Sequence, residues 1–338
     1  MKSVESLGER MIIDMILKRL EPMPDMPIPF GDDASAVDLG NGRLGVIKTD
    51  MLVGKTDVPP EMSLWQAARK AVVMNISDLA AKGAKPVALM VSLGVPRHFT
   101  EKDIEEIANG LNAGAREYGA YILGGDTSEA CDLIINCAVF GIADKRILML
   151  RSGAKPGDIV AVTGSFGKTA AGLRILLGLI SPPARLEKKL IDSVLMPKAR
   201  LNEGLALAQT GAITSSIDSS DGLAWSLHEL SKASNVGFLI DNLPIAEEVA
   251  DLAKRHEVDP VELCLYGGEE YELVVTVKPA LLERARKKVP LIRIGKATAE
   301  KTLTLKMFKK RVPIAPRGWE HFKTTIPKSR MRKGGIFS

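Results

Sequence analysis

The chain has 338 residues, of which 46% are hydrophobic and 26% are charged, a composition typical of a globular protein large enough for two domains. The formal net charge of +5 is a mild excess, and the basic residues near the end lack the interleaved aromatic residues that stack on bases. We therefore expect no nucleic-acid partner. No stretch approaches about 18 consecutive apolar residues, so we expect no membrane span, and three cysteines without metal-ligand spacing favour reduced, buried thiols in the cytoplasm.

The first half of the chain alternates between predicted helices and strands. A helix is expected over 3–20, because its apolar residues recur at helical spacing and the prolines between 22 and 29 cannot continue it. The next predicted elements are strands over 34–39 and 44–49, a helix over 63–82 that Gly83 closes, a strand over 87–93, a helix over 101–118, and strands over 120–123 and 133–142.

A segment rich in helix and strand breakers, RSGAKPGD over 151–158, predicts a domain boundary. Beyond it the pattern indicates a strand over 159–162, helices within 168–179 and 199–210, a helix over 223–231, strands over 236–240 and 271–277, and a helix over 279–288. The sequence therefore predicts two α/β domains of similar size, over 1–150 and 151–325, followed by a basic tail over 326–338.

The stretch VTGSFGKTAAG, over 162–172, resembles a phosphate-binding Walker A loop but fails its spacing. That loop requires G-x-x-x-x-G-K-[ST], so a loop ending at Gly167, Lys168 and Thr169 needs a glycine at position 162, where this chain has valine. Val162 ends an apolar run that indicates a buried strand. We therefore expect a strand-to-helix turn whose glycines allow close packing, and phosphate binding elsewhere.

Asp78 is the most informative single carboxylate. In the predicted helix over 63–82, apolar residues step by three and four along one face, and the next step is Asp78; they are Leu64, Ala67, Ala71 and Met74. A carboxylate on a packed face must be neutralised, paired or bound to a metal. An ion pair with a Lys or Arg, exposure near the helix end, and a metal site are the alternatives at this point.

Other aspartates follow or precede predicted elements, where sites are usually built. Asp126 comes after a short strand and two glycines, which would let the backbone approach a ligand, although a turn aspartate that accepts from Thr127 or Ser128 would have the same sequence. Asp221 precedes an apolar helical stripe, so it is either a helix N-cap or a ligand. An N-cap role for Asp221 would not explain why a second aspartate, Asp218, lies three residues earlier.

Asp32 and Asp33 are adjacent like charges, which repel each other unless a cation or hydrogen bonds compensate them. The four histidines have no metal-ligand spacing and no spacing of a serine-type triad. Because oxygen ligands from several loops suit Mg²⁺ rather than zinc, the residues favour Mg²⁺ bound by carboxylates.

At this point eight motifs in order resemble those of the thiamine-monophosphate kinases. They are GDDASA, TDMLVG, NISDLAAKGAKP, YILGGDTS, RSGAKPGD, VTGSFGKTAAG, IDSSDGL and YGGEEYEL, and with the C-terminal aromatic region the match runs from residue 31 to residue 321. Each motif alone is weak, whereas eight in order are specific. This family belongs to a superfamily with aminoimidazole ribonucleotide synthetase, selenophosphate synthetase and a hydrogenase-maturation protein.

The resemblance implies an α/β (α+β) fold of the aminoimidazole ribonucleotide synthetase-like type. Its N-terminal α/β domain would form a dimer barrel in a homodimer, and its C-terminal domain would be an α/β sandwich. The implied reaction is phosphorylation of thiamine monophosphate to thiamine diphosphate by direct in-line transfer from ATP, with several Mg²⁺ ions and no protein nucleophile. The family's metal ligands fall on Asp33, Thr49, Asp50, Asp78, Asp126, Asp218 and Asp221, its ATP contacts on Gly125, Asp126, Arg151 and Ser220, and its substrate contacts on Glu269 and Trp319.

One departure from the family concerns the acceptor. After TDMLV the family usually continues to a glycine and a His-Phe pair near the substrate, whereas here Asp57 stands where the His is expected. Asp57 is therefore also a candidate substrate contact. Two alternatives stay open, namely an enzyme of the same superfamily that acts on a different phosphorylated acceptor, and a non-catalytic nucleotide-binding homologue.

Overall fold

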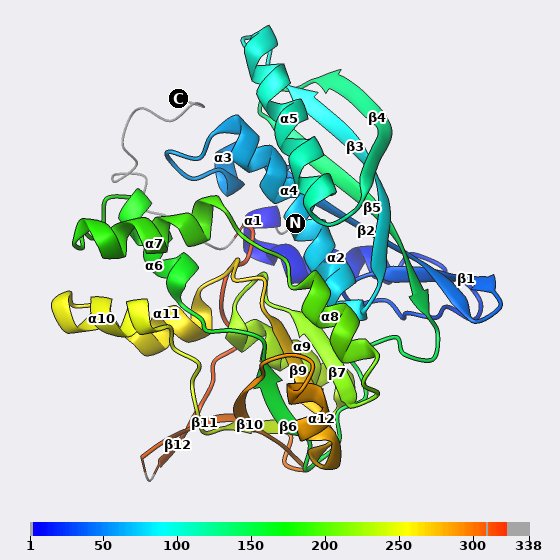
Figure 1. Cartoon of the computed structure of the whole chain (residues 1–338), viewed down its shortest axis with the longest axis vertical. Coiled ribbons are helices and arrows are strands. Elements are labelled where there is room, and N and C mark those ends of the chain that lie inside the picture. The colour runs from blue at the N-terminus through cyan, green and yellow to red at the C-terminus, as the bar shows by residue number, and fades with distance from the viewer. Residues whose placement is uncertain (1–2, 309, 323–338) are drawn as a thin grey trace.

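The computed structural model describes residues 3–308 and 310–322, and the predicted basic tail over 326–338 lies outside them. Two α/β units follow one another along the chain, and Figure 1 shows the sheet of the first above the strands of the second. Among the described residues, none of the helices combines the length and the apolar character that crossing a bilayer would require.

The first unit is built on a five-stranded sheet. Its strand order is β1 (Ser35–Gly40), β2 (Arg43–Val53), β5 (Ile134–Asp144), β3 (Lys85–Val95) and β4 (Tyr121–Glu129). Neighbouring strands are antiparallel except β3 and β4, which are parallel and are connected through α5 (Glu101–Glu117). A short helix, α3 (Gly54–Asp57), follows β2.

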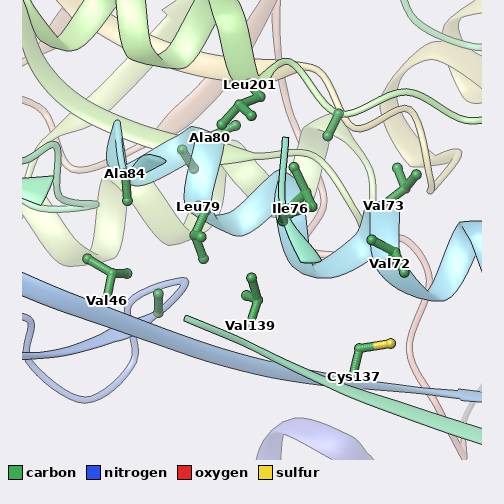
Figure 2. Packing of buried hydrophobic residues seen from close by; sticks show 14 of the residues in the cluster. Val46, Val72, Val73, Ile76, Leu79, Ala80, Ala84, Cys137, Val139 and Leu201 are labelled. Atoms are coloured by element: carbon green, nitrogen blue, oxygen red, sulfur yellow. The ribbon is translucent and has the colours of Figure 1, made fainter. Parts of the chain in front are cut away.

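Helix α4 (Leu64–Lys82) is the central element of the molecule, since 16 of its 19 residues are buried. Ser63 and Gln66 form a capping box at its start, and Gly83, with a left-handed φ of 66°, ends it. The helix packs on β2, β5 and α5 of the first unit and on α8 and β7 of the second. Figure 2 shows Leu79 of α4 on the side of Val46 and Val139, and Leu201 of the second unit on the opposite side.

The second unit is built on a seven-stranded mixed sheet. Its strand order is β12 (Lys310–Pro313), β11 (Leu303–Met307), β8 (Gly237–Ile240), β10 (Ile292–Thr298), β6 (Ile159–Val162), β9 (Leu273–Val277) and β7 (Ile213–Asp218). Its helices are α6 (Lys168–Leu176), α7 (Ala184–Leu195), α8 (Leu201–Ala208), α9 (Leu223–Ser234), α10 (Glu247–Arg255), α11 (Pro260–Tyr266) and α12 (Leu282–Arg286), the last preceded by the 3₁₀ turn η1 (Pro279–Leu281).

Three predictions need correction. The helix predicted over 3–20 is two helices, α1 (Val4–Leu7) and α2 (Glu9–Leu17), because Gly8 adopts a φ of 73° between them. The strand predicted over 120–123 continues as β4 to Glu129, so that Asp126 lies within a strand rather than at its end. Cys131 is exposed, whereas the other two cysteines are buried as predicted, and all three are free.

Candidate active site

Three buried carboxylates meet where the two units are joined. Asp33 precedes β1, Asp78 lies in the last turns of α4, and Asp218 ends β7, and each residue is no more than 5% exposed. One carboxylate oxygen from each residue lies within 4.8 Å of the other two. We call these three residues the carboxylate cluster. Asp78 is thus buried on a packed face, as its helical spacing predicts.

Three cationic side chains surround the carboxylate cluster. The Lys48 ammonium lies 3.1 Å from the Asp78 carboxylate and 3.0 Å from that of Asp50. Lys82, which is fully buried, pairs with Asp33 at 2.7 Å and also with Asp32. An ion pair, one of the alternatives that the sequence left open for Asp78, is therefore present, and Lys82 compensates the repulsion between Asp32 and Asp33.

Arg151 is the third of these cations, and it connects the cluster to the segment between the two units. Its guanidinium donates through Nε to Asp33 at 2.8 Å, and through Nη1 to the carbonyl of Gly31 at 3.0 Å. Its backbone N–H donates to Asp32 at 2.9 Å. The guanidinium is thus held in a fixed orientation beside the cluster.

Negative charge exceeds positive charge at this position, since five carboxylates face three cations. Burial, with further contributions from the neighbouring aspartates, raises the pKa of Asp78 well above its usual value, although Lys48 opposes this shift. Burial and the Asp33 charge raise the pKa of Asp218 to about 7. Although Asp33 is also buried, Arg151 and Lys82 hold its pKa below the usual range. Cations bound at the cluster would relieve this excess.

Side chains alternate between the two faces of the sheet along β2, and this separates the predicted site residues Thr49 and Asp50. Lys48 and Asp50 point to the side of α4, and the Asp50 N–H donates to the buried Asn75 side chain at 2.9 Å. Thr49 points to the opposite, exposed side, where its hydroxyl donates to Asn136 at 3.0 Å. The structure therefore brings Asp50 to the cluster and leaves the Thr49 side chain on the other face of the sheet.

Asp126 and Gly125 lie in β4, exposed and outside the carboxylate cluster. Gly125 is explained by the neighbouring strand, because a Cβ at this position would lie 1.7 Å from the carbonyl oxygen of Val91. The sequence interpretation, in which this glycine makes room for a ligand, is therefore not needed to account for it.

Asp221 is not the N-cap of α9, because Gly222 holds that position. The Asp221 carboxylate instead pairs with Arg10 of α2 at 3.3 Å, and Arg10 also pairs with Glu229 and lies 3.6 Å from the centroid of the Trp225 ring. Burial raises the pKa of Asp221 to about 6, against the opposing charge of Arg10. The N-terminal helix α2 thus covers this side of the site.

The predicted substrate contacts Glu269 and Trp319 lie close to Ser220, a predicted ATP contact, and to Asp221. The exposed Ser220 accepts a hydrogen bond at its carbonyl from the N–H of Glu269, with a length of 2.6 Å. Trp319 is half-buried, and its N–H donates to the carbonyl of Asp221 at 3.1 Å. Asp57 is also half-buried, and its carboxylate accepts from the N–H of Val53 at 2.7 Å, within its own helical turn.

The turn that imitates a Walker loop has its helix N-terminus filled by a protein carboxylate. Glu270 accepts from the N–H groups of Gly167 and Thr169, at 2.7 and 3.0 Å, at the start of α6. Burial raises the pKa of this carboxyl to about 7, although both N–H groups oppose the shift. An anion position at a helix N-terminus exists here, but the chain itself occupies it.

Sequence reasoning missed the cations Lys48, Lys82 and Arg10. Lys48 had a detectable signal, because strand alternation places it on the same face as Asp50. Lys82 had another, since it follows Asp78 by one helical turn. Arg10 had none, because its partners lie more than 200 residues away along the chain.

Comparison with known proteins places this geometry in a family. The model for AIR synthase related protein, N-terminal domain, matches residues 31–143, and that for the C-terminal domain matches residues 155–307. The thiamine-monophosphate kinase of Pyrococcus abyssi is 38% identical over 94% of this chain and 97% of its own length. The chain belongs to the thiamine-monophosphate kinase family. The enzyme of the same name from Bacillus subtilis is 33% identical, with coverage of 92% and 98%.

Solved structures of the family have the same fold. AaThiL complexed with AMPPCP and TMP superposes with a TM-score of 0.84 at 28% identity, covering 95% of this chain and 99% of that one. The E. coli hydrogenase maturation protein HypE, with a TM-score of 0.67 and 19% identity, shares the fold alone. The predicted family and its two-domain α/β fold are thereby confirmed.

Proposed function

We propose that this protein transfers the γ-phosphoryl group of ATP to thiamine monophosphate and releases thiamine diphosphate and ADP. The observation that carries this proposal is the carboxylate cluster of Asp33, Asp78 and Asp218 at the junction of the units, in a chain of the thiamine-monophosphate kinase family. A solved structure of this fold is complexed with AMPPCP and TMP, which supports the same pair of substrates here. The acceptor phosphate oxygen is the nucleophile, so the reaction needs none from the protein.

We propose Mg²⁺ as the metal, because the donor set is carboxylate oxygen and carries excess negative charge. Asp33, Asp78 and Asp218 would hold it. Asp50 lies next to them, because Lys48 forms ion pairs with both Asp50 and Asp78. Thr49, Asp126 and Asp221 are proposed as further ligands from the family resemblance. When bound, Mg²⁺ neutralises charge on the β- and γ-phosphate oxygens.

On the nucleotide side we propose Arg151 as the main phosphate contact from the protein. Its guanidinium is already oriented by Asp33 and Gly31, so little side-chain entropy is lost when a phosphate oxygen accepts from it. Gly125, Asp126 and Ser220 are proposed to contact ATP as in the family resemblance, and all three are exposed.

On the acceptor side we propose Glu269 and Trp319, with Asp57 as the residue that distinguishes this chain from the usual family pattern. Trp319 is half-buried and its Cβ lies beside Gly268, and we propose that its ring stacks on a flat cationic acceptor. The Asp57 carboxylate already accepts a hydrogen bond from the Val53 N–H. If Asp57 contacts the acceptor, its carboxylate must share or release that bond.

The direct test is an acceptor panel with the full chain, ATP and Mg²⁺. We expect equal amounts of ADP and thiamine diphosphate with thiamine monophosphate, and neither product with thiamine or with phosphate alone. ADP formation with another phosphorylated acceptor would support a different enzyme of the superfamily. No ADP with any acceptor, despite Mg²⁺-dependent ATP binding, would support a non-catalytic homologue.

We also propose that the domain boundary lies at about residue 150, since the two family models leave 144–154 between them. The predicted basic tail over 326–338 is assigned no role. A cytoplasmic location stays a prediction, and the three free cysteines agree with it.

We propose a homodimer through the outer face of the first sheet. Six large apolar side chains on β2, β3 and β4 are exposed on this face by 40–72%; they are Ile47, Met51, Val87, Met90, Tyr121 and Leu123. Strand β4 is also an edge strand of the described sheet, with hydrogen-bonding groups available for a further strand. A second copy of the chain would cover the apolar face and complete the barrel that the family resemblance implies.

Leu123→Glu is expected to convert the dimer to a monomer, because Leu123 is 72% exposed and a carboxylate there would be buried in the interface. Light scattering after size exclusion should show the mass falling from about twice 36.4 kDa to 36.4 kDa. The matched control is Leu179→Glu, at an exposed leucine of the second unit, which should remain dimeric. A wild-type mass of 36.4 kDa would contradict the proposed dimer.

A further inference from the structure

Lys70 is a buried cation that the proposed mechanism does not use. It lies on α4, eight residues before Asp78, and is only 1% exposed. Its ammonium pairs with the Glu269 carboxylate at 2.5 Å and donates to the carbonyl oxygen of Asp57 at 2.9 Å. A buried ammonium is retained only where such partners compensate its lost hydration.

The two partners of Lys70 belong to different units of the molecule. Asp57 ends the short helix α3, and its carbonyl is one of the last-turn carbonyls that a helix cannot satisfy internally. Glu269 belongs to the segment between α11 and β9. One ammonium group therefore joins a helix end of the first unit to a loop of the second.

The loop that carries Glu269 has an unusual backbone. Glu269 and Tyr271 adopt left-handed φ values of 62° and 52°, conformations that residues other than glycine adopt at a cost in backbone strain. Their N–H groups donate to the carbonyls of Ser220 and Ser219, which adjoin Asp218 and Asp221. The loop is thus held by its backbone against residues 219–220, next to Asp218 and Asp221, and it is held against α4 by Lys70.

We propose that Lys70 is a positioning residue of the acceptor site. It fixes Glu269 and α3 relative to each other, and it ties both to α4, the helix that also carries Asp78 eight residues further along. The identity of the acceptor rests on the proposed function, whereas the tether between the two segments does not.

The kinetic test compares Lys70→Met with Lys55→Met, a control at an exposed lysine of α3. Lys70→Met is expected to raise the KM for thiamine monophosphate by about tenfold or more and to change the KM for ATP by less than about twofold, because only the acceptor side is misplaced. The control should match the wild type. Equal increases in both KM values would overturn the proposal, since they would indicate a general structural role.

A second comparison asks whether Lys70 acts through Glu269. Lys70→Met leaves the Glu269 carboxylate without its partner, so Glu269→Gln and the double variant are needed as well. If Lys70 positions Glu269, the double variant should have the same acceptor KM as Glu269→Gln alone. An increase in KM equal to the product of the two single fold-changes would show that the residues act independently and would overturn this role.

Hydrogen exchange of the nucleotide-free protein tests the tether without any acceptor. In Lys70→Met we expect faster exchange, by about tenfold or more, in peptides covering 54–58 and 267–272, with α5 unchanged. Unchanged exchange in both peptides would overturn the proposal. A wild-type chain that is inactive on thiamine monophosphate would contradict the proposed function alone, and the exchange result would still decide the role of Lys70.

Discussion

Asp78→Asn is expected to lower kcat by about a thousandfold or more, equivalent to roughly 4 kcal/mol of transition-state stabilisation. One carboxylate oxygen of Asp78 lies within 4.8 Å of oxygens of Asp33 and Asp218. Lys48 forms an ion pair with Asp78 and a second ion pair with Asp50. Asparagine keeps the shape of the side chain but removes the charge that would hold a divalent ion. Steady-state kinetics at saturating ATP and acceptor, over a range of Mg²⁺ concentrations, measures the loss.

The same variant should fold normally. Burial and neighbouring aspartates raise the pKa of Asp78, so its ionised form is disfavoured in the folded protein, and a neutral amide removes that penalty. We expect the metal-free Tm to stay level or rise, and the increase in Tm on adding Mg²⁺ and ATP to disappear.

Asp158→Asn is the matched control for Asp78→Asn. Asp158 is also buried, but its carboxylate accepts from the Lys155 N–H and the Thr214 hydroxyl, and so it has a purely structural environment. The control should lower the Tm and leave kcat within about twofold. If Asp78→Asn instead lowered the Tm and kept its activity, the cluster would be a structural ion-pair network and not a metal site.

The helical pattern around Asp78 shows what periodicity can predict. The stripe of apolar residues correctly placed Asp78 on a buried face of a helix that ends at Gly83 as predicted, whereas the capping box at Ser63 was not predicted. It did not identify the partners, because Lys48 comes from a strand and Asp218 from the other unit. Such partners depend on tertiary packing, which local spacing does not determine.

Strand β7 shows why other parts of the site were missed. Its sequence ITSSID is polar, yet the strand is largely buried, because the Ser215 hydroxyl bonds to Thr276 of β9 at 2.7 Å. Hydroxyl pairs across strands hide the apolar alternation on which strand prediction relies. Without β7, the sequence could not place Asp218 at a strand end beside α4. Helices α7, α10 and α11 and strands β10, β11 and β12 were likewise not predicted.

Strand β4 gave a misleading signal for a different reason. Its two glycines suggested the end of a strand, but Gly125 lies so close to the Val91 carbonyl that only glycine fits within the pairing. A glycine that ends a strand and one that permits close pairing look alike in a sequence. The position of Asp126 within β4 therefore required the structure.

Arg151→Met is expected to lower kcat/KM for ATP by about a hundredfold, because it removes a charged donor whose orientation is fixed in advance. Four bonds produce that orientation, from Nε and Nη2 to Asp33, from Nη1 to the Gly31 carbonyl and from the backbone N–H to Asp32. Arg151→Lys should recover only part of the loss, since an ammonium lacks the planar fork with which the guanidinium is held by Asp33 and the Gly31 carbonyl in one orientation. Initial rates at varied ATP and fixed acceptor measure both variants.

The control for Arg151→Met is Arg146→Met, which removes an exposed guanidinium from its ion pair with Asp144 and should leave kcat/KM unchanged. Arg151 also joins the segment between the units to Asp33, so its loss should lower the Tm as well. The two effects are separable, because Asp33 keeps its pair with Lys82 at 2.7 Å and the cluster should still bind Mn²⁺ in the absence of nucleotide. Loss of Mn²⁺ binding, or a lower Tm with an unchanged KM for ATP, would show that Arg151 stabilises the junction of the units and does not contact the phosphates.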